Sequence, residues 1–142
     1  MILLERLTTA HIQAITLQPA QACVQGVLTA EFARDLTQHK GVGWAAVRDG
    51  QVIAAAGIVE MWEHRATAWA LFSQDAIDGF IQIHRAVRDV LADAPWRRVE
   101  MTVDAHHDAG VRWAERLGFQ CEGLMRAYTA DGRDCFLFAK VK

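Results

Sequence analysis

Apolar residues recur at intervals of three and four between Thr9 and about Lys40, and Pro19 divides this stretch into two parts. Such spacing places the apolar side chains on one face of a helix, so the pattern predicts two successive amphipathic helices. The short apolar segment before them, from Ile2 to Leu7, is typical of a strand. The apolar positions of the two helices are Ile12, Ile15, Val24, Val27, Leu28, Phe32 and Leu36.

Two apolar runs meet at Asp49 and Gly50. An Asp-Gly pair in this setting is typical of a tight hairpin turn, because both residues tolerate the positive φ that the turn requires. The second run extends from Gln51 to about Trp62, and after a turn at residues 63–65 a third strand is expected from Thr67 to Phe72. The sequence therefore predicts a meander of three antiparallel strands.

A third helix is expected after the meander. Ser73 or Asp75 can cap its N-terminus, and it ends at Ala94 because Pro95 cannot continue a helix. Beyond Pro95, apolar and polar residues alternate, which predicts another strand. The apolar face of the helix consists of Ile77, Phe80, Ile81, Val87 and Leu91, and the strand has Val99, Met101 and Val103 on one face.

The remaining residues predict a helix and a hairpin. The helix runs from His107 to Leu117, and Gly118 follows at the position where the backbone adopts the left-handed conformation. A strand from Gln120 to Tyr128 comes next, then a turn at residues 131–132 (Asp-Gly), and a last strand from Cys135 to Val141.

The predicted order of elements is β-α-α-β-β-β-α-β-α-β-β. Antiparallel strands interrupted by two helical crossovers indicate an α+β fold, with one mixed sheet of about 6–7 strands and helices on both faces. The length of 142 residues suits one domain, and no linker, repeat or low-complexity segment interrupts it. We therefore expect a single domain over residues 1–142.

Composition excludes several classes of protein. The formal net charge is −2, and the basic residues are scattered, which gives no signal for nucleic-acid binding. No apolar run approaches the length of a membrane helix, and the first residues lack the pattern of a secretion signal. We expect a cytoplasmic protein without a membrane partner. Its three cysteines form no CxxC pair, so neither a disulfide framework nor a metal site is expected.

The C-terminal stretch VDAHHDAGVRWAERLGFQCEGLMRAYTADGRDCFLFAKV has a recognisable order of features. A helix, Leu-Gly-Phe, Glu-Gly, an arginine, a tyrosine, Asp-Gly and an aromatic final strand follow one another. Together with the order of the predicted elements over the whole chain, this resembles the GNAT (Gcn5-related N-acetyltransferase) fold family. The resemblance implies an acyltransferase that uses acetyl-CoA.

In GNAT proteins acetyl-CoA enters a notch where two neighbouring strands splay apart. Transposed to this chain, the notch lies between residues 67–73 and 99–104. The resemblance implies cofactor contacts from the end of the third meander strand and the following helix start, and from the start of the later helix, where GNAT proteins often carry an asparagine. The implied cofactor-binding residues are Leu71, Phe72, Ser73, Gln74 and His107, with backbone N–H groups near Leu71 or Phe72 polarising the thioester carbonyl. The alternative for His107, at a junction of strand and helix, is that it caps the helix or faces solvent.

The chain departs from the GNAT pattern at two places. The usual glycine-rich pyrophosphate loop is replaced by SQDAIDGF, which brings Asp75 and Asp78 to the helix start. Carboxylates there repel a diphosphate. At the position where many members carry a tyrosine that protonates the departing thiolate, this chain has Ala114.

An attacking amine must lose a proton, which requires a base. Glu60, near the end of the second meander strand, and His64, in the following turn, are the candidate catalytic residues. The alternative is that both are solvated charges of a turn.

Two hypotheses of function follow. The first is a GNAT-like acyltransferase that moves an acetyl group from acetyl-CoA to a small-molecule or peptide amine and acts mainly by proximity. The second is a catalytically inactive GNAT-fold interaction or assembly protein, present as a homodimer or with a virion partner. Short GNAT-like phage proteins of the internal virion type are similar in size and in the missing loop.

Overall fold

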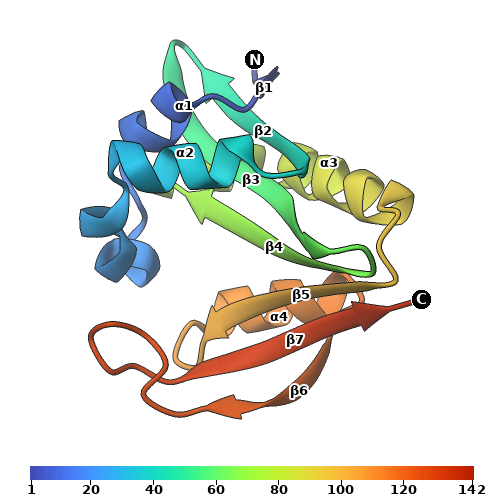
Figure 1. Ribbon diagram of the computed structural model, residues 1–142. Helices are drawn as coiled ribbons and strands as arrows, with labels where there is room; N and C mark the ends of the chain where they lie inside the picture. The colour runs from blue at the N-terminus through green and yellow to red at the C-terminus, as the bar shows by residue number, and fades with distance from the viewer. The chain divides into compact units, whose positions relative to one another are not determined.

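Seven strands form one mixed sheet in the order β1-β2-β3-β4-β5-β7-β6. The structure is a computed structural model that describes residues 1–142. The N-terminal elements are β1 (Leu3–Arg6), α1 (Thr9–Ala14), the 3₁₀ helix η1 (Pro19–Val27), α2 (Ala30–Gln38), β2 (Gly41–Arg48), β3 (Gln51–Trp62) and β4 (Arg65–Phe72). The 3₁₀ helix η2 (Gln74–Gly79), α3 (Phe80–Asp93), β5 (Arg98–Asp104), α4 (Asp108–Arg116), β6 (Gln120–Met125) and β7 (Cys135–Val141) follow (Figure 1).

Contacts between residues divide the chain into two compact units. Unit 1 contains Met1–Val59 and Trp69–Ala94, and unit 2 contains Glu60–Ala68 and Pro95–Lys142. The mixed α+β fold expected from the element order is confirmed. That the whole chain behaves as a single domain stays a prediction.

In unit 1, side-chain caps and Pro19 determine where the helices begin. Thr8 accepts a hydrogen bond from the backbone N–H of His11 at the start of α1, and Thr29 accepts one from Phe32 at the start of α2. The segment between them forms the 3₁₀ helix η1, which begins at Pro19. Two α-helices, α1 and α2, occupy this region as predicted, and the 3₁₀ helix η1 lies between them.

The main core of unit 1 lies between the sheet and the helices α1 and α2. Ile12 and Ile15 are almost completely buried and pack with Ala33 of α2 and Leu71 of β4. Burying an isoleucine side chain contributes about 1.5–3 kcal/mol, so these two residues hold the N-terminal helices to the sheet. Val52 of β3 packs against the same cluster.

The opposite face of the sheet in unit 1 packs against η2. A Cβ added to Gly79 would lie 1.9 Å from the Cδ1 of Ile2 and 3.8 Å from the Cδ1 of Ile53. Neighbouring residues of a strand point to opposite faces, so Val52 meets α1 and α2 while Ile53 meets η2. Helices therefore cover both faces of this part of the sheet.

Unit 2 is built around β7, which pairs with β5 on one side and β6 on the other, both antiparallel. Helix α4 contacts β5, and its residues Trp113 and Ala114 are buried. Gly118 adopts a φ of 94°, as predicted for the residue after this helix, and the next residue, Phe119, is buried. Because Phe119 donates its N–H to the carbonyl of Ala114, the chain turns back at once onto the helix.

The strand β6 is shorter than the sequence predicts. It ends at Met125, and Ala127 has a φ of 49°, which interrupts an extended backbone. Tyr128 therefore lies outside the strand and is 54% exposed.

Candidate functional site

The outer edge of β4 near its end binds a side-chain amide. The carboxamide of Gln21 in η1 donates from Nε2 to the carbonyl of Ala70 (2.8 Å) and accepts at Oε1 from the N–H of Phe72 (2.9 Å). The backbone N–H of Gln18 donates to the carbonyl of Phe72 at 2.8 Å. Three backbone groups on one edge of β4 are thus paired with η1 and the residue before it.

This edge is the one that faces away from β3. The N–H of Ser73 donates to the carbonyl of Ile53 in β3, and backbone groups alternate in direction along a strand. Ala70 and Phe72 therefore face the side opposite to β3, and Leu71 faces β3. On the outer side β4 also pairs with β5 in parallel, over Arg65–Thr67 with Arg98–Glu100.

The alternation affects the predicted cofactor contacts. The N–H of Phe72 has the direction that the resemblance implies, but it already donates to Gln21. The N–H of Leu71 points toward β3. Of the two predicted donors, only Phe72 is directed to the outer edge of the strand.

Ser73 and Gln74 lie at one end of β4 beside a hollow of about 420 Å³ in unit 1. Ser73 is buried and its hydroxyl accepts from the N–H of Asp75. The other walls of the hollow come from Thr16 and Leu17, from the β2–β3 turn at Gly50, and from Gln51 and Asp75.

The start of η2 carries two carboxylates and contacts one guanidinium. The N–H of Asp75, the second residue of η2, donates to the Ser73 hydroxyl, and the carbonyl of Asp75 accepts from the guanidinium of Arg48 at 3.0 Å. The carboxylates of Asp75 and Asp78 are on exposed residues. The negative charge that the sequence places at this helix start is therefore present on the surface.

Glu60, the first candidate base, lies near the end of β3 in unit 2. One carboxylate oxygen accepts a hydrogen bond of 2.6 Å from the indole N–H of Trp96. Trp96 is 4% exposed, which holds the indole in place. The position of the Glu60 carboxylate is thus fixed by a buried donor 36 residues away.

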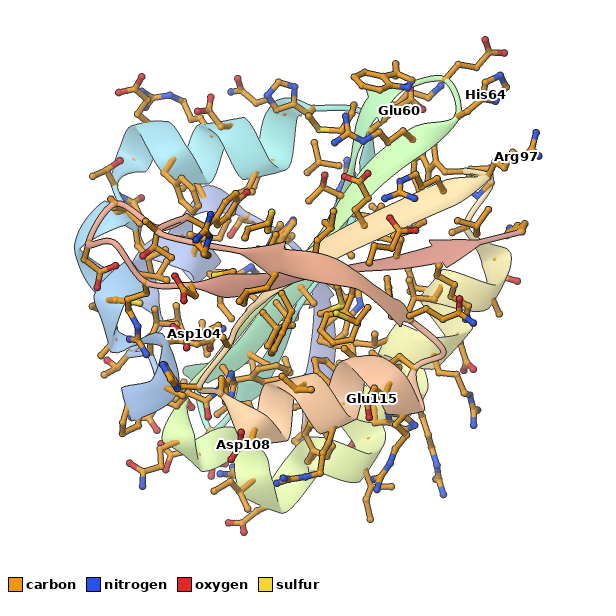
Figure 2. All side chains as sticks on the ribbon, turned by 90° about the horizontal axis from the view of Figure 1, so that it is seen from below. Glu60, His64, Arg97, Asp104, Asp108 and Glu115 are labelled. Carbon is orange, nitrogen blue, oxygen red and sulfur yellow. The ribbon has the colours of Figure 1, made fainter.

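His64, the second candidate, lies in the turn between β3 and β4. Figure 2 shows its side chain and that of Glu60 at this hairpin, with the His64 ring pointing outward. His64 is exposed, and its backbone carbonyl accepts from the N–H of Arg98. No hydrogen bond joins the two side chains, so Glu60 and His64 do not form a coupled Glu–His pair that could act as one general base. Their catalytic roles stay predictions.

Close to this hairpin, unit 2 contains a network of two arginines and two glutamates. Arg65 donates two hydrogen bonds to Glu100 (2.7 and 2.8 Å), and Arg98 donates one to Glu100 (2.6 Å) and two to Glu122 (2.5 and 3.1 Å). The hydrogen bonds from Arg65, ahead of those from Arg98, lower the pKa of Glu100. The hydrogen bonds from Arg98 likewise lower the pKa of Glu122.

The same network raises the pKa of both arginines. For Arg98 the chief cause is its hydrogen bonding to Glu122, and for Arg65 its hydrogen bonding to Glu100. All four groups therefore keep their charges at neutral pH. The lowered pKa values make both carboxylates weaker proton acceptors than an unpaired glutamate.

His107 precedes α4 as its N-cap residue, but its side chain makes no capping hydrogen bond. The ring lies over Gly110, where an added Cβ would be 2.6 Å from Nδ1. Ala114, at the position of the usual acid, has no exposed surface. No group of three or more His, Cys, Asp or Glu side chains could hold a metal ion.

Several solved structures with a similar fold are acetyltransferases. One is an acetyltransferase of the GNAT family from Streptococcus pneumoniae, with a TM-score of 0.69, 13% identity and 99% of each chain covered. A ribosomal-protein-alanine N-acetyltransferase from Brucella melitensis has a TM-score of 0.76, 17% identity and 99% of each chain covered. The chain has the fold of GNAT acetyltransferases.

A third similar structure is the ribosomal-protein-S18-alanine N-acetyltransferase from Escherichia coli, with a TM-score of 0.73 and 18% identity over 99% of this chain and 94% of that one. No protein-family model and no curated protein matches the sequence. No helix is long and apolar enough to cross a membrane. The likeness at these identities concerns the GNAT fold, and the splayed notch beside residues 67–73 stays a prediction.

Sequence reasoning missed two residues that engage the candidate site. Gln21 reaches β4 across 49 residues of chain, and no pattern around it distinguishes it from the neighbouring glutamines. Trp96 is one of five tryptophans in the chain, and the sequence does not distinguish it from the others. Its position directly after Pro95, next to a strand, gives no indication of a partner on β3.

Proposed function

We propose that this chain is an acyltransferase that transfers an acetyl group from acetyl-CoA to an amine. The chain has the GNAT fold, and the outer edge of β4 is the proposed binding site for the acyl donor, acetyl-CoA. The observation that carries the proposal is that the backbone of Ala70 and Phe72 pairs with an amide and not with a strand. The pantetheine arm of acetyl-CoA carries secondary amides of the same hydrogen-bonding type.

The residues of β4 fit such an arm. The carbonyl of Ala70 and the N–H of Phe72 lie two residues apart on one edge, and together they accept and donate to one carboxamide. Ser73 and Gln74, which follow on, line the adjacent hollow. Bound acetyl-CoA would supply an activated thioester, whose carbonyl is open to attack by an amine.

The diphosphate of acetyl-CoA has no matching site at η2. The Ser73 hydroxyl accepts from the N–H of Asp75, and Asp75 and Asp78 carry negative charge there. Affinity in this proposal therefore comes from the amide arm, and the carboxylates oppose it.

Glu60 is the proposed base. A carboxylate accepts a proton from an ammonium acceptor, directly or through a water molecule, which leaves the lone pair of the nitrogen free to attack. The hydrogen bond from Trp96 fixes the carboxylate in one orientation. His64 is exposed at the neighbouring turn and is the second choice.

A peptide α-amine is the first acceptor to test. Two of the three similar proteins named above are ribosomal-protein-alanine N-acetyltransferases. An α-amine has a pKa near 7.7–8.0, against about 10.4 for lysine, so less work is required of a base. This suits a site with Ala114 in place of a tyrosine and one carboxylate as the base.

Thermal unfolding in the presence of acetyl-CoA tests the donor site. A ligand at 100 times its Kd stabilises the native state by about 2.7 kcal/mol, which corresponds to a rise in Tm of roughly 5–10 °C for a chain of this size. Adenosine 3′,5′-bisphosphate, which lacks the arm, should give a smaller rise. A Tm that does not change up to millimolar acetyl-CoA contradicts the proposal. Mass spectrometry of an alanine-terminated peptide then tests transfer.

Two observations favour a non-catalytic GNAT-fold protein as a second candidate. Ala114 is fully buried, so no acid stands at the usual position, and Gln21 fills the edge of β4 that the donor needs. Such a protein binds a partner chain or a second copy of itself. A flat titration with acetyl-CoA together with self-association in analytical ultracentrifugation would favour this candidate. No observation favours a virion partner or a phage origin, and these form no part of the proposal.

A further inference from the structure

The Gln21 carboxamide imitates one residue of a parallel strand. In a parallel ladder a residue donates to the carbonyl before its partner and accepts from the N–H after it. Gln21 does this around Leu71, through Ala70 and Phe72. The Gln18 side chain supports the arrangement by donating to Gln21 Oε1 at 3.4 Å. The backbone groups at this end of β4 thereby obtain partners, as buried backbone groups require.

We propose that Gln21 is a built-in competitor of the acyl donor, which must displace its carboxamide from Ala70 and Phe72 before binding. This rests on the proposed function, in which an amide arm pairs with the same edge. The competition takes place at the N–H of Phe72. A backbone N–H supplies one donor, whereas the carbonyl of Ala70 has two lone pairs and can accept two hydrogen bonds. Phe72 therefore donates either to Gln21 or to the arm.

Displacement requires only a change of the Gln21 rotamer. Gln21 is half-buried, and η1 contains no buried residue. The backbone of this region is held independently, because the N–H of Gln18 donates to the carbonyl of Phe72 and Gln25 bonds to the chain before η1. The side chain of Gln21 can thus leave the strand while η1 stays in place.

Gln25 provides a matched control. Its carboxamide accepts from the N–H of Leu17 (2.7 Å) and donates to the carbonyl of Ile15 (3.0 Å), again two residues apart. It belongs to the same 3₁₀ helix as Gln21 and makes the same kind of contact, but not with β4. Gln25→Ala therefore removes two hydrogen bonds of the same kind and leaves the edge of β4 paired with Gln21.

The experiment is a calorimetric titration of acetyl-CoA into the wild type, Gln21→Ala, Gln21→Met and Gln25→Ala. Methionine keeps the approximate volume of glutamine and removes both hydrogen bonds, so it guards against a loss of folding in the alanine variant. In both Gln21 variants the two hydrogen bonds to β4 no longer compete with acetyl-CoA. We therefore expect these variants to bind acetyl-CoA about tenfold more tightly than the wild type. Gln25→Ala should bind as the wild type or more weakly.

Amide hydrogen exchange at Phe72 gives an independent readout. The N–H of Phe72 should exchange faster in Gln21→Met than in the wild type, and acetyl-CoA should restore its protection in the variant. In Gln25→Ala the exchange at Phe72 should match the wild type.

The outcomes separate the two proposals. If all four proteins bind acetyl-CoA equally, or if the Gln21 variants bind it more weakly, the proposal that Gln21 competes with acetyl-CoA is wrong, while the proposed donor site on β4 still stands. If none of them binds at millimolar concentration, the proposed function fails and the competition fails with it. Unchanged exchange at Phe72 in both Gln21 variants also overturns the competition.

Discussion

The indole N–H of Trp96 donates a hydrogen bond of 2.6 Å to the carboxylate of Glu60. The two residues come from segments 36 positions apart, and both belong to unit 2. A buried indole that directs its only polar atom at a carboxylate satisfies its own N–H and orients the acid at the same time. This contact makes Glu60 the best-positioned carboxylate of the β3–β4 hairpin for accepting a proton.

Replacing Glu60 by glutamine should remove the base and keep the contact with Trp96, because a carboxamide oxygen still accepts from the indole. We expect the turnover of a peptide amine to fall about 100-fold or more. Glu63→Gln, in the adjoining turn, is the control and should retain activity. Steady-state release of CoA thiol measures both. Equal turnover of the wild type and Glu60→Gln would remove Glu60 from the proposed mechanism.

The acidic start of η2 should weaken donor binding. Neutralising the exposed carboxylates in the double variant Asp75→Asn and Asp78→Asn is expected to tighten acetyl-CoA binding roughly 2- to 5-fold at low salt, by removing repulsion of the phosphates. The gain should shrink at high salt, where surface charges are screened. Asp93→Asn, at the far end of α3, should have no such effect. Titration at two salt concentrations tests this, and a salt-independent gain would point to a different cause.

Glu100 should make the stability of the protein depend on pH in the acid range. Hydrogen bonds from Arg65 and Arg98 lower its pKa in the folded state, so its stabilising contribution is complete above the ordinary glutamate pKa and is lost as the pH falls through the folded-state pKa. At pH 7, Glu100→Gln should lower the free energy of unfolding by about 2–3 kcal/mol, because it removes charge-assisted hydrogen bonds from a buried acceptor.

Urea denaturation between pH 7 and pH 3 measures this effect. The difference between the wild type and Glu100→Gln should begin to narrow as the pH falls below the ordinary glutamate pKa, and should narrow further as Glu100 becomes protonated in the folded state. Glu122→Gln, on the exposed side of the same network, should give a much smaller difference at pH 7. A difference that stays constant with pH would contradict the assigned role of the Glu100 charge.

Gly118 should tolerate no side chain without a loss of stability. Its φ of 94° lies in the region that a residue with a Cβ adopts only at a cost, so Gly118→Ala is expected to destabilise the protein by about 1–2 kcal/mol. Gly26→Ala is the control, since an added Cβ there has no neighbour within 4 Å and the residue lies in a helical segment. It should be neutral or slightly stabilising. Chemical denaturation of both variants provides the comparison.

The elements that the sequence predicted correctly are those decided by short-range geometry. The turn at Asp49 and Gly50 has both residues at positive φ, and Ser73 caps the next helical segment as expected. Pro95 follows the end of α3, and Gly118 ends α4. Each of these depends on atoms within a few residues of chain, so the local sequence contains the necessary information.

Where local preferences are weak, the element boundaries predicted from the sequence differ from those of the structure. The stretch from Thr9 to Lys40 has helical periodicity, yet the structure forms η1 between α1 and α2, with Thr29 capping the last of them. The strand after Gly118 ends at Met125 and not at Tyr128, where the chain turns. In both cases the apolar pattern of the sequence continues beyond the residue at which the helix or strand ends and its regular backbone hydrogen bonding stops.

The order of strands and helices and the acidic replacement of the phosphate loop were determined by the sequence itself, because they are properties of consecutive residues. Only the tertiary structure decided that Gln21 pairs with Ala70 and Phe72 and that Trp96 orients Glu60. Their partners lie 36 to 51 residues away. A hydrogen bond across such a distance depends on how the elements pack, since any glutamine or tryptophan has the same donors and acceptors before the chain folds.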